Sequence, residues 1–165
     1  MRAVKAPIAM ISLCAALAIA GCGSSSGSST ESSGSTATES TSAKTKPDVT
    51  VPKGAPPKKL VVKEIEKGSG AEAKSGSEVT VQYVGVDYKN GKEFDSSWSR
   101  DEPFSFALGA GQVIPGWDQG VAGMKEGGRR ELIVPPSLAY GAAGQPPTIG
   151  PNETLVFVID LLEVN

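Results

Sequence analysis

Residues 115–124 read "PGWDQGVAGM", and this stretch decides the fold because no other part of the chain's C-terminal two-thirds has the pattern of a helix. Pro115 can occupy the first helical position, and Trp117, Val121 and Met124 recur at i, i+4 and i+7 on one face. The glycines between them each cost about 1 kcal/mol relative to alanine. Intrinsic propensity would not hold such a helix, so we expect a packed sheet to stabilise it.

The sequence on both sides of this helix predicts strands. Residues 78–94, "EVTVQYVGVDYKNGKEF", are typical of a β-hairpin, because Val79, Val81 and Tyr83 alternate with polar residues and Asn90-Gly91 is a strong turn signal. Further predicted strands are "KLVVKEIEKG" (59–68), "PFSFAL" (103–108), "RRELIV" (129–134) and "TLVFVIDLLEV" (154–164). The pattern predicts an α+β domain, a mainly antiparallel sheet wrapped around one short helix.

The amino terminus has the order of a signal peptide. Positive charges at Arg2 and Lys5 precede an apolar run of about 14 residues, which is shorter than the roughly 20 needed to span a membrane. Residues 19–22, "IAGC", resemble the bacterial lipoprotein signal, in which cleavage leaves a lipid-bearing cysteine, here Cys22, as the first residue. An ordinary secretory cleavage site is the alternative. Cys14 would leave with the peptide, so we expect no disulfide in the mature protein.

A Ser/Gly-rich segment follows and gives way to a Pro-rich one. It has no periodic apolar residues and cannot bury enough surface to offset chain entropy. We therefore predict a signal peptide over residues 1–21, a disordered linker over 22–57 and a folded domain over 58–165. The linker's lysines could attract anionic lipid or could simply keep the segment soluble. These lysines are Lys44, Lys46, Lys53, Lys58 and Lys59.

The composition excludes several kinds of chemistry. The chain has no histidine, and the predicted domain has no cysteine, so Ser-His and Cys-His nucleophilic catalysis are excluded. No metal-ligand or nucleotide-binding motif occurs, so we expect neither metal nor cofactor. Basic residues are interspersed with acidic ones, and nucleic acid is not an expected partner. The domain does carry aromatic residues on many separate elements, which could form either an ordinary core or the wall of a pocket.

Several motifs occur in a fixed order. They are "VQYVG" (81–85), "FDSS" (94–97), "PFSFALG" (103–109), "VIPGWDQGV" (113–121), "AYG" (139–141) and "TLVFVIDLL" (154–162). This ordered set, over roughly 90 residues, closely resembles the FK506-binding protein family of peptidyl-prolyl cis-trans isomerases.

The resemblance implies a half-open antiparallel sheet of about five strands around one helix. It also implies an apolar pocket between them that receives a proline ring, with Trp117 as its floor. The implied catalytic residues are Tyr83, Phe94, Asp95, Trp117, Tyr140 and Phe157. The implied substrate-binding residues are Arg100, Phe104, Val113, Ile114 and Ile149.

The resemblance also assigns polar contacts. Asp95 is expected to be a buried residue of the pocket wall that interacts with Tyr140 and Arg100, and the alternative is an exposed loop aspartate. The backbone N–H of Ile114 and the hydroxyl of Tyr140 are expected to donate to carbonyls that flank the bound proline.

Two places depart from the family pattern. Residues 142–152 have Gln145, Thr148 and Gly150 where relatives often carry His, Ile and Pro, which leaves macrolide affinity and the preference for the residue before proline open. Trp98 is also unusual, and it could form a rim contact for substrate or fold back onto Arg100.

Together these features predict an isomerase of X-Pro bonds in exported proteins, outside the cytoplasm and lipid-anchored to a bacterial membrane through Cys22. The expected partners are proline-containing polypeptides, with macrolide inhibitors as further ligands, and we expect a monomer. One alternative is a weakly catalytic or non-catalytic proline-binding chaperone module. A purely structural surface lipoprotein is a third reading, and it would need no pocket.

Overall fold

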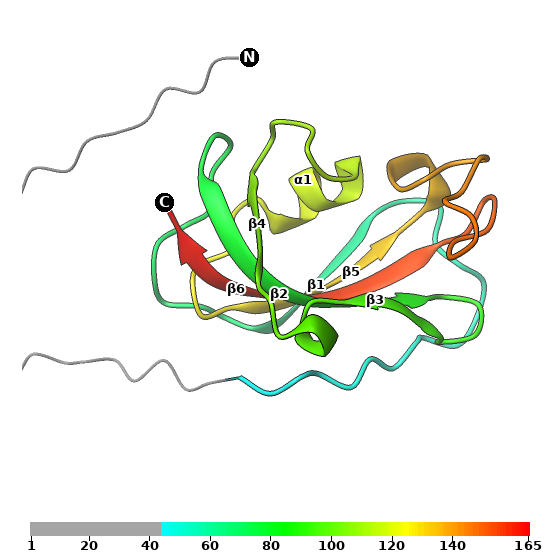
Figure 1. The fold of residues 1–165 in the computed structure, drawn as a ribbon, viewed down its shortest axis with the longest axis horizontal. Coiled ribbons are helices and arrows are strands. Elements are labelled where there is room, and N and C mark those ends of the chain that lie inside the picture. Colours follow the sequence, from blue (N-terminus) through cyan, green and yellow to red (C-terminus); the bar gives the residue numbers. More distant parts are fainter. Residues whose placement is uncertain (1–43) are drawn as a thin grey trace, which may run out of the picture. The chain divides into compact units, whose positions relative to one another are not determined.

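The computed structural model describes residues 44–165, which form an antiparallel sheet around one short helix (Figure 1). The strands are β1 (Val61–Glu66), β2 (Glu78–Asp87), β3 (Glu93–Ser96), β4 (Phe104–Ala107), β5 (Arg129–Val134) and β6 (Leu155–Val164). The helix is α1 (Pro115–Val121), with short 3-10 helices η1 (Trp98–Arg100) and η2 (Pro136–Leu138). The predicted α+β class is confirmed, and the sheet is 6-stranded. Among the described residues, no helix has the length and apolar character to cross a membrane.

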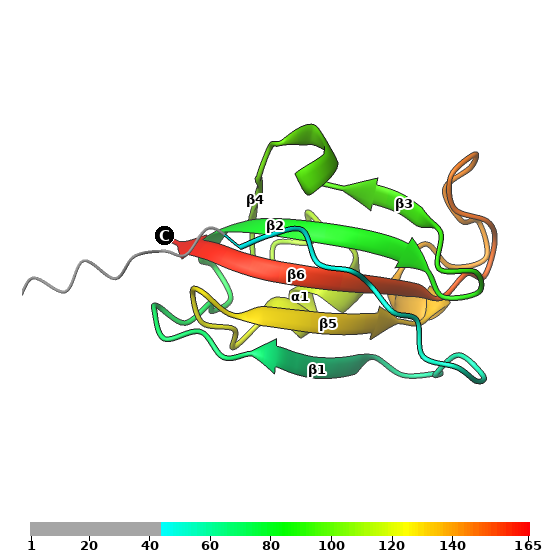
Figure 2. The ribbon, with the colours of Figure 1, turned by 90° about the horizontal axis from the view of Figure 1, so that it is seen from below.

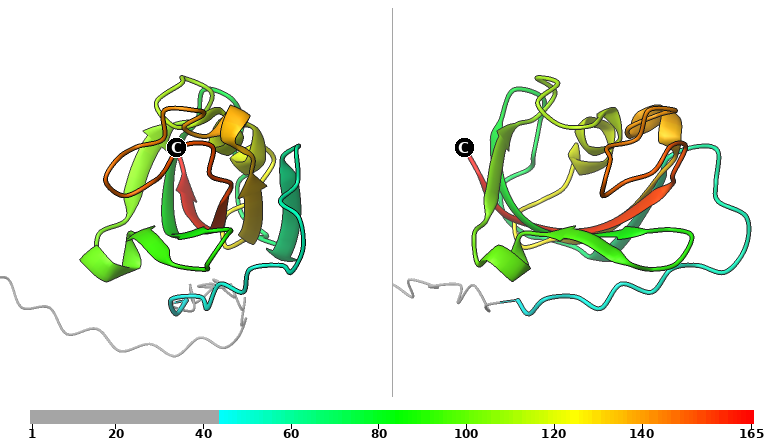
Figure 3. Two further views of the ribbon diagram at one scale, coloured as in Figure 1. Left: turned by 90° about the vertical axis from the view of Figure 1, so that its right-hand side faces the viewer. Right: turned by 45° about the vertical axis from the view of Figure 1, so that its right-hand side comes forward.

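The sheet has the strand order β1-β5-β6-β2-β3 (Figure 2). The remaining strand, β4, pairs with the amino-terminal part of β2. All of these pairings are antiparallel. β3 pairs with residues 84–86 of β2, whereas β4 pairs with residues 78–81. The chain between β3 and β4 therefore leaves the sheet as the η1 turn. The sheet curls, and its concave face holds α1 (Figure 3).

The predicted hairpin is present, with β2 and β3 joined by residues 88–92. Gly91 has a φ of 70°, the left-handed conformation that the Asn90-Gly91 signal predicts. Two main-chain hydrogen bonds close the turn. The amide of Gly91 donates to the carbonyl of Asp87 at 2.8 Å, and the amide of Asp87 donates to the carbonyl of Lys92 at 2.9 Å. The turn is therefore longer than a two-residue connection.

Helix α1 is held by close packing. A Cβ atom at Gly116 would lie 2.4 Å from the side chain of Val134, and one at Gly120 would lie 2.5 Å from that of Leu132. The glycines therefore let the helix approach β5 more closely than alanine would. The predicted apolar face is confirmed, since Trp117, Val121 and Met124 are all buried.

The helix ends earlier than predicted, at Val121 instead of residue 124. Ala122 already has an extended backbone, and Gly123 has a φ of 75°. The guanidinium of Arg130 donates to the carbonyls of Gly120 and Ala122, at 2.8 and 3.1 Å. These bonds satisfy carbonyl groups that lack partners at a helix end.

Residues 44–57, which we call the strap, lie along the outer face of the sheet (Figures 1 and 2). A second apolar cluster on that face consists of Val84, Val86, Ile133 and Val156, and two strap residues, Val49 and Val51, pack against it. Residues 44–57 of the predicted linker therefore lie against the folded sheet. The earlier part of the predicted linker and the predicted signal peptide with Cys22 lie outside the described residues.

The first residues of the strap bind a charged cluster. The ammonium of Lys44 lies 2.9 Å from Glu66 and 3.4 Å from Asp160, whose side chain is fully buried. The guanidinium of Arg129 contacts both carboxylate oxygens of Asp160, at 2.6 and 2.8 Å, and also donates to the carbonyl of Thr45 at 2.9 Å. Lys44 is therefore engaged within the domain instead of lying free for lipid.

Candidate active site

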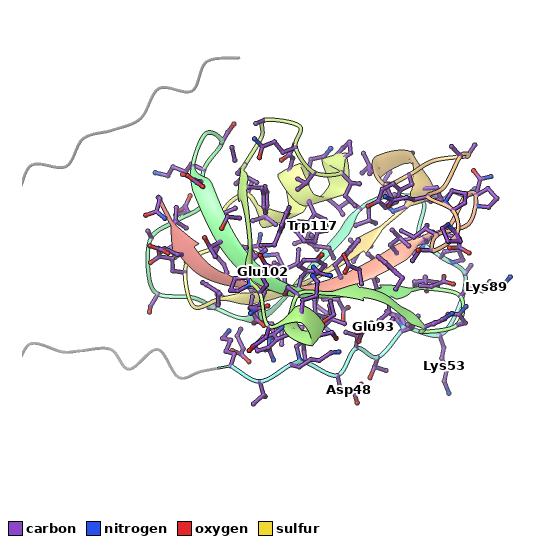
Figure 4. The ribbon with its side chains drawn as sticks, in the orientation of Figure 1. Asp48, Lys53, Lys89, Glu93, Glu102 and Trp117 are labelled. Carbon is purple, nitrogen blue, oxygen red and sulfur yellow. The ribbon has the colours of Figure 1, made fainter. Side chains whose placement is uncertain are left out.

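A pocket of about 360 Å³ opens between the concave face of the sheet and the start of α1. Figure 4 shows Trp117 between the helix and the sheet. The pocket is lined by Tyr83, Phe94, Asp95, Phe104, Gln112, Val113, Ile114, Trp117, Tyr140 and Phe157. Residues far apart in the sequence thus converge because the curled sheet brings β2, β3, β4 and β6 around one helix.

Aromatic rings pack against one another around the pocket. The indole of Trp117 meets the rings of Tyr83 and Phe157 edge to face, with centroids 5.0 and 5.3 Å apart. Phe94 meets Phe157 in the same way at 5.6 Å. Pairs of this geometry each contribute about 0.5–1.5 kcal/mol beyond buried area. Trp117 is 4% exposed, so it belongs to the core and also forms the pocket floor.

Gly85 makes the ring arrangement possible, and the sequence analysis did not identify it as a site residue. A Cβ atom there would lie 2.7 Å from Phe94 and 2.9 Å from Phe157. A glycine inside a strand often marks a close approach of other atoms, and this signal was available in the sequence.

The polar wall of the pocket is a three-residue network. The hydroxyl of Tyr83 donates to Asp95, the guanidinium of Arg100 donates to the same carboxylate, and Arg100 also donates to the Tyr83 oxygen at 3.0 Å. The Asp95 side chain is 40% exposed, which is intermediate between the buried wall residue that was predicted and its exposed alternative.

The expected hydrogen bond between Asp95 and Tyr140 is absent among the described residues. Asp95 lies opposite Gly85 in the β2–β3 ladder, and Tyr83 is two residues along β2 on the same face. This register brings the Tyr83 hydroxyl to the carboxylate. Tyr140 is nevertheless close enough for the Asp95 charge to affect its pKa.

The network fixes the protonation states of its members. Burial alone would raise the pKa of Asp95, but hydrogen bonds from Tyr83 and Arg100, with the Arg100 charge, hold that pKa below its usual value. Burial and the hydrogen bond to Asp95 raise the pKa of Tyr83 to about 12. Hydrogen bonds to Tyr83 and Asp95 raise the pKa of Arg100. The carboxylate is therefore charged and the phenol neutral at ordinary pH.

Two hydrogen-bond donors at the pocket have no acceptor within residues 44–165. They are the backbone N–H of Ile114, at the N-cap of α1, and the hydroxyl of Tyr140. Burial, and then the charge of Asp95, raise the pKa of Tyr140, which keeps its hydroxyl protonated. Both groups lie where they were expected, and their roles toward substrate remain predictions.

Of the four other residues assigned to substrate binding, two line the pocket and two do not. Val113 and Phe104 line the pocket as predicted, and Gln112 lines it without having been identified. Ile149 is buried in the core and does not line the pocket, so its predicted contact with substrate is not supported by its position. Arg100 reaches the pocket only through Asp95 and Tyr83.

Trp98 follows neither of the two readings that were considered. Its ring packs against the outer-face cluster, so it is not a contact on the pocket rim. The guanidinium of Arg100 lies 5.9 Å from the ring centroid of Tyr83 instead. Within the described part of the chain, no group of acidic, His or Cys side chains is arranged to hold a metal ion.

Fold and site together define a class of protein: a half-open antiparallel sheet around one helix, with an apolar aromatic pocket suited to non-covalent binding of a ring. Residues 70–162 match the family described as FKBP-type peptidyl-prolyl cis-trans isomerase. The chain belongs to this family and is an FKBP-type peptidylprolyl isomerase.

Individual relatives agree with this assignment. The FK506-binding protein of Streptomyces anulatus is 57% identical over 120 residues, which cover 72% of this chain and 97% of the relative. FkpA from Escherichia coli aligns with a TM-score of 0.59 and 48% identity, over 64% of this chain and 48% of that one. AtFKBP13 aligns with a TM-score of 0.60 and 38% identity, over 64% of this chain and 93% of its own.

Proposed function

We propose that this isomerase acts on X-Pro bonds of exported polypeptides outside the cytoplasm, and that lipid on Cys22 holds it at a bacterial membrane. The support is the order of segments in one chain: a signal-like apolar run, a cysteine after small residues, and then the isomerase domain. The catalytic part of the proposal rests on the convergence of the aromatic rings around one pocket.

The barrier to rotation about an X-Pro bond is about 18–20 kcal/mol because amide resonance is lost in the twisted state. No covalent bond has to form or break, so the residues need only favour the twisted amide. In our proposal the proline ring rests on the indole of Trp117 between Tyr83 and Phe157. Water stabilises the planar, charge-separated amide, and the apolar walls exclude that water. The pocket therefore binds the twisted form more tightly than the planar form.

The two unpaired donors orient the substrate in this proposal. The N–H of Ile114 and the hydroxyl of Tyr140 donate to carbonyls on either side of the proline, which replaces hydrogen bonds that those carbonyls lose to burial. The Asp95–Arg100 pair holds the Tyr83 ring against Trp117. An acceleration of about 10⁴–10⁵ would require roughly 5–7 kcal/mol of preference for the twisted amide.

We propose macrolide binding at the same pocket, because the relatives are named for FK506 binding. The residue before proline and the macrolide would both lie under the 142–152 loop, where Gln145, Thr148 and Gly150 differ from the usual residues. We therefore expect this loop to set the affinity. A proline-binding chaperone module with weak turnover is the second candidate, and the departures in this loop are what favour it.

A protease-coupled assay of the full chain on short X-Pro peptides tests the catalytic proposal. We expect acceleration well above background, inhibited by FK506. Binding of the peptide without acceleration would favour the chaperone module.

Cell fractionation tests the anchoring proposal. The chain should partition with membranes, and Cys22→Ser should release it. Cys14→Ser is the matched control, because Cys14 would be removed with the signal peptide and its replacement should change nothing. If both variants stayed with the membranes, or if both were released, a lipid on Cys22 would be contradicted.

A further inference from the structure

Lys46 in the strap joins the two ends of the segment that carries the pocket wall. Its ammonium lies 2.9 and 2.8 Å from the two carboxylate oxygens of Glu93 and 3.0 Å from the hydroxyl oxygen of Ser99. The Ser99 hydroxyl in turn donates to Glu93 at 3.1 Å. These three side chains close a ring that spans β3 and η1.

This ring encloses two residues that line the pocket and ends beside a third residue that bonds to its polar wall. Phe94 and Asp95 follow Glu93 directly and line the pocket, and Arg100 follows Ser99. β3 is an edge strand that pairs with β2 at three positions with a register shift among them, and beyond it buried Ser97 bonds to the main chain of Tyr83. The strap is therefore an additional support for the pocket wall.

The segment and the strap also share an apolar cluster on the outer face of the sheet. Trp98 packs against the outer-face cluster, and so do Val49 and Val51 of the strap. The strap and the segment thus pack on one shared apolar cluster at the outer face, and the ion pair of Lys46 with Glu93 joins them directly. Figure 4 shows Glu93 above the strap, on the side of the sheet opposite Trp117.

We propose that Lys46 is a positioning residue for isomerisation: by binding Glu93 and Ser99 from the strap, it fixes the 93–100 segment and so the placement of Phe94, Asp95 and Arg100. This proposal rests on the pocket being the isomerase site. Lys46 acts from outside the pocket and touches no residue that lines it among the contacts of the described chain.

The ion pair should have little effect on global stability. The side chains of Lys46 and Glu93 are 41% and 39% exposed, and exposed pairs contribute little to the free energy of unfolding. Its effect should instead be local, in the fit of the pocket to substrate. Loss of the pair should therefore lower kcat/KM about three- to fivefold with the melting temperature unchanged within about 2 °C.

The test uses the full chain with Lys46→Met, which removes the charge and keeps the alkyl stem. The matched control is Lys53→Met, in the same strap, because Lys53 has no ion-pair partner among residues 44–165. We expect lower kcat/KM and faster amide hydrogen exchange over residues 93–100 in Lys46→Met, with α1 unaffected. We expect neither change in Lys53→Met.

The charge-swapped double variant, Lys46→Glu with Glu93→Lys, should restore at least half of the lost kcat/KM. Each of the two single variants should keep the lowered kcat/KM. Equal kinetics for Lys46→Met and Lys53→Met would overturn the proposal, and so would a swap that fails to restore activity. A fall of more than about 5 °C in the melting temperature of Lys46→Met would also overturn it, by showing a global effect. Absence of activity in the unaltered chain would instead refute the proposed function.

Discussion

At the scale of single residues, the sequence predicted the aromatic composition of the pocket better than its polar contacts. The rings of Trp117, Tyr83 and Phe157 pack together as expected. This could be predicted because each residue belongs to a distinctive motif of the sequence. Of the two partners predicted for Asp95, Arg100 is confirmed, whereas Tyr83 takes the place of Tyr140, because that contact depends on how β2 and β3 are paired. Strand register is a three-dimensional property that the Asp95 motif does not carry.

Replacement of Asp95 by valine should reduce kcat/KM more than about tenfold, a loss of roughly 1.4 kcal/mol or more in transition-state stabilisation. The reason is that Arg100 and Tyr83 lose their shared acceptor, and the Tyr83 ring loses its fixed position. The measurement is the protease-coupled rate, with circular dichroism to show that the fold persists. Glu102→Gln, at an exposed neighbouring site, should be unchanged, and equal rates for both variants would contradict the role of Asp95.

The pH dependence of activity should be flat, within about twofold, from pH 5 to 9. The chain has no histidine, and the network has a carboxyl pKa below its usual value and a phenol pKa of about 12. A depressed pKa of Asp95 stabilises the fold above the unfolded value of about 3.9, and this contribution is lost as pH falls through the folded value. The raised pKa of Tyr83 stabilises the fold below about pH 10, and this stabilisation is lost as pH rises through about 12.

A profile of kcat/KM against pH, with thermal melts at each pH, measures both effects. Stability should decline below about pH 4, and Asp95→Asn should remove part of this decline. An inflection in activity near neutral pH would show that another group controls the reaction.

At the scale of elements, the short helix shows where sequence prediction succeeds and where it stops. The spacing of Trp117, Val121 and Met124 correctly predicted the buried face of α1. The same sequence did not show that Gly116 and Gly120 are sites of contact with β5, since the partner side chains belong to another element. The helix end was also missed, because Arg130 of β5 takes part in it.

Gly120→Ala should destabilise the domain by about 1–3 kcal/mol, although alanine favours a helix by about 1 kcal/mol over glycine. The added methyl would lie 2.5 Å from Leu132, so either the helix or the core has to move. Urea unfolding measures the change. Gln119→Ala, at the exposed neighbouring position of the same helix, is the control and should be neutral or slightly stabilising.

At the scale of the whole molecule, the folded unit begins earlier than its composition suggested. Val49 and Val51 alternate with threonine in a run too short and too close to proline to read as a strand, and the structure has them without a strand partner. Their apolar partners on β2, β5 and β6 are more than 30 residues away in the sequence. The sequence alone carried no sign that residues before 58 pack on the domain, since only the folded sheet creates the surface that the strap covers.

Removal of residues 1–57 should lower the free energy of unfolding by about 2–4 kcal/mol relative to removal of residues 1–43. The loss combines uncovered apolar surface at the second cluster with the missing Lys44 contact to buried Asp160. Urea unfolding followed by tryptophan fluorescence measures it. Equal stability of the two chains would show that the strap adds nothing to the fold.

The contacts of the strap have a mechanical consequence, because a load that pulls residues 44–57 away from the sheet has to break them in turn. Lys44 can detach while Arg129 still neutralises Asp160, so the first step under load is small. Continued traction would then lift Lys46 off Glu93 and peel Val49 and Val51 from the sheet before the sheet itself yields. Optical-trap extension from the amino-terminal side should record a short early release ahead of the main unfolding event, and a single cooperative rupture would exclude this graded yielding.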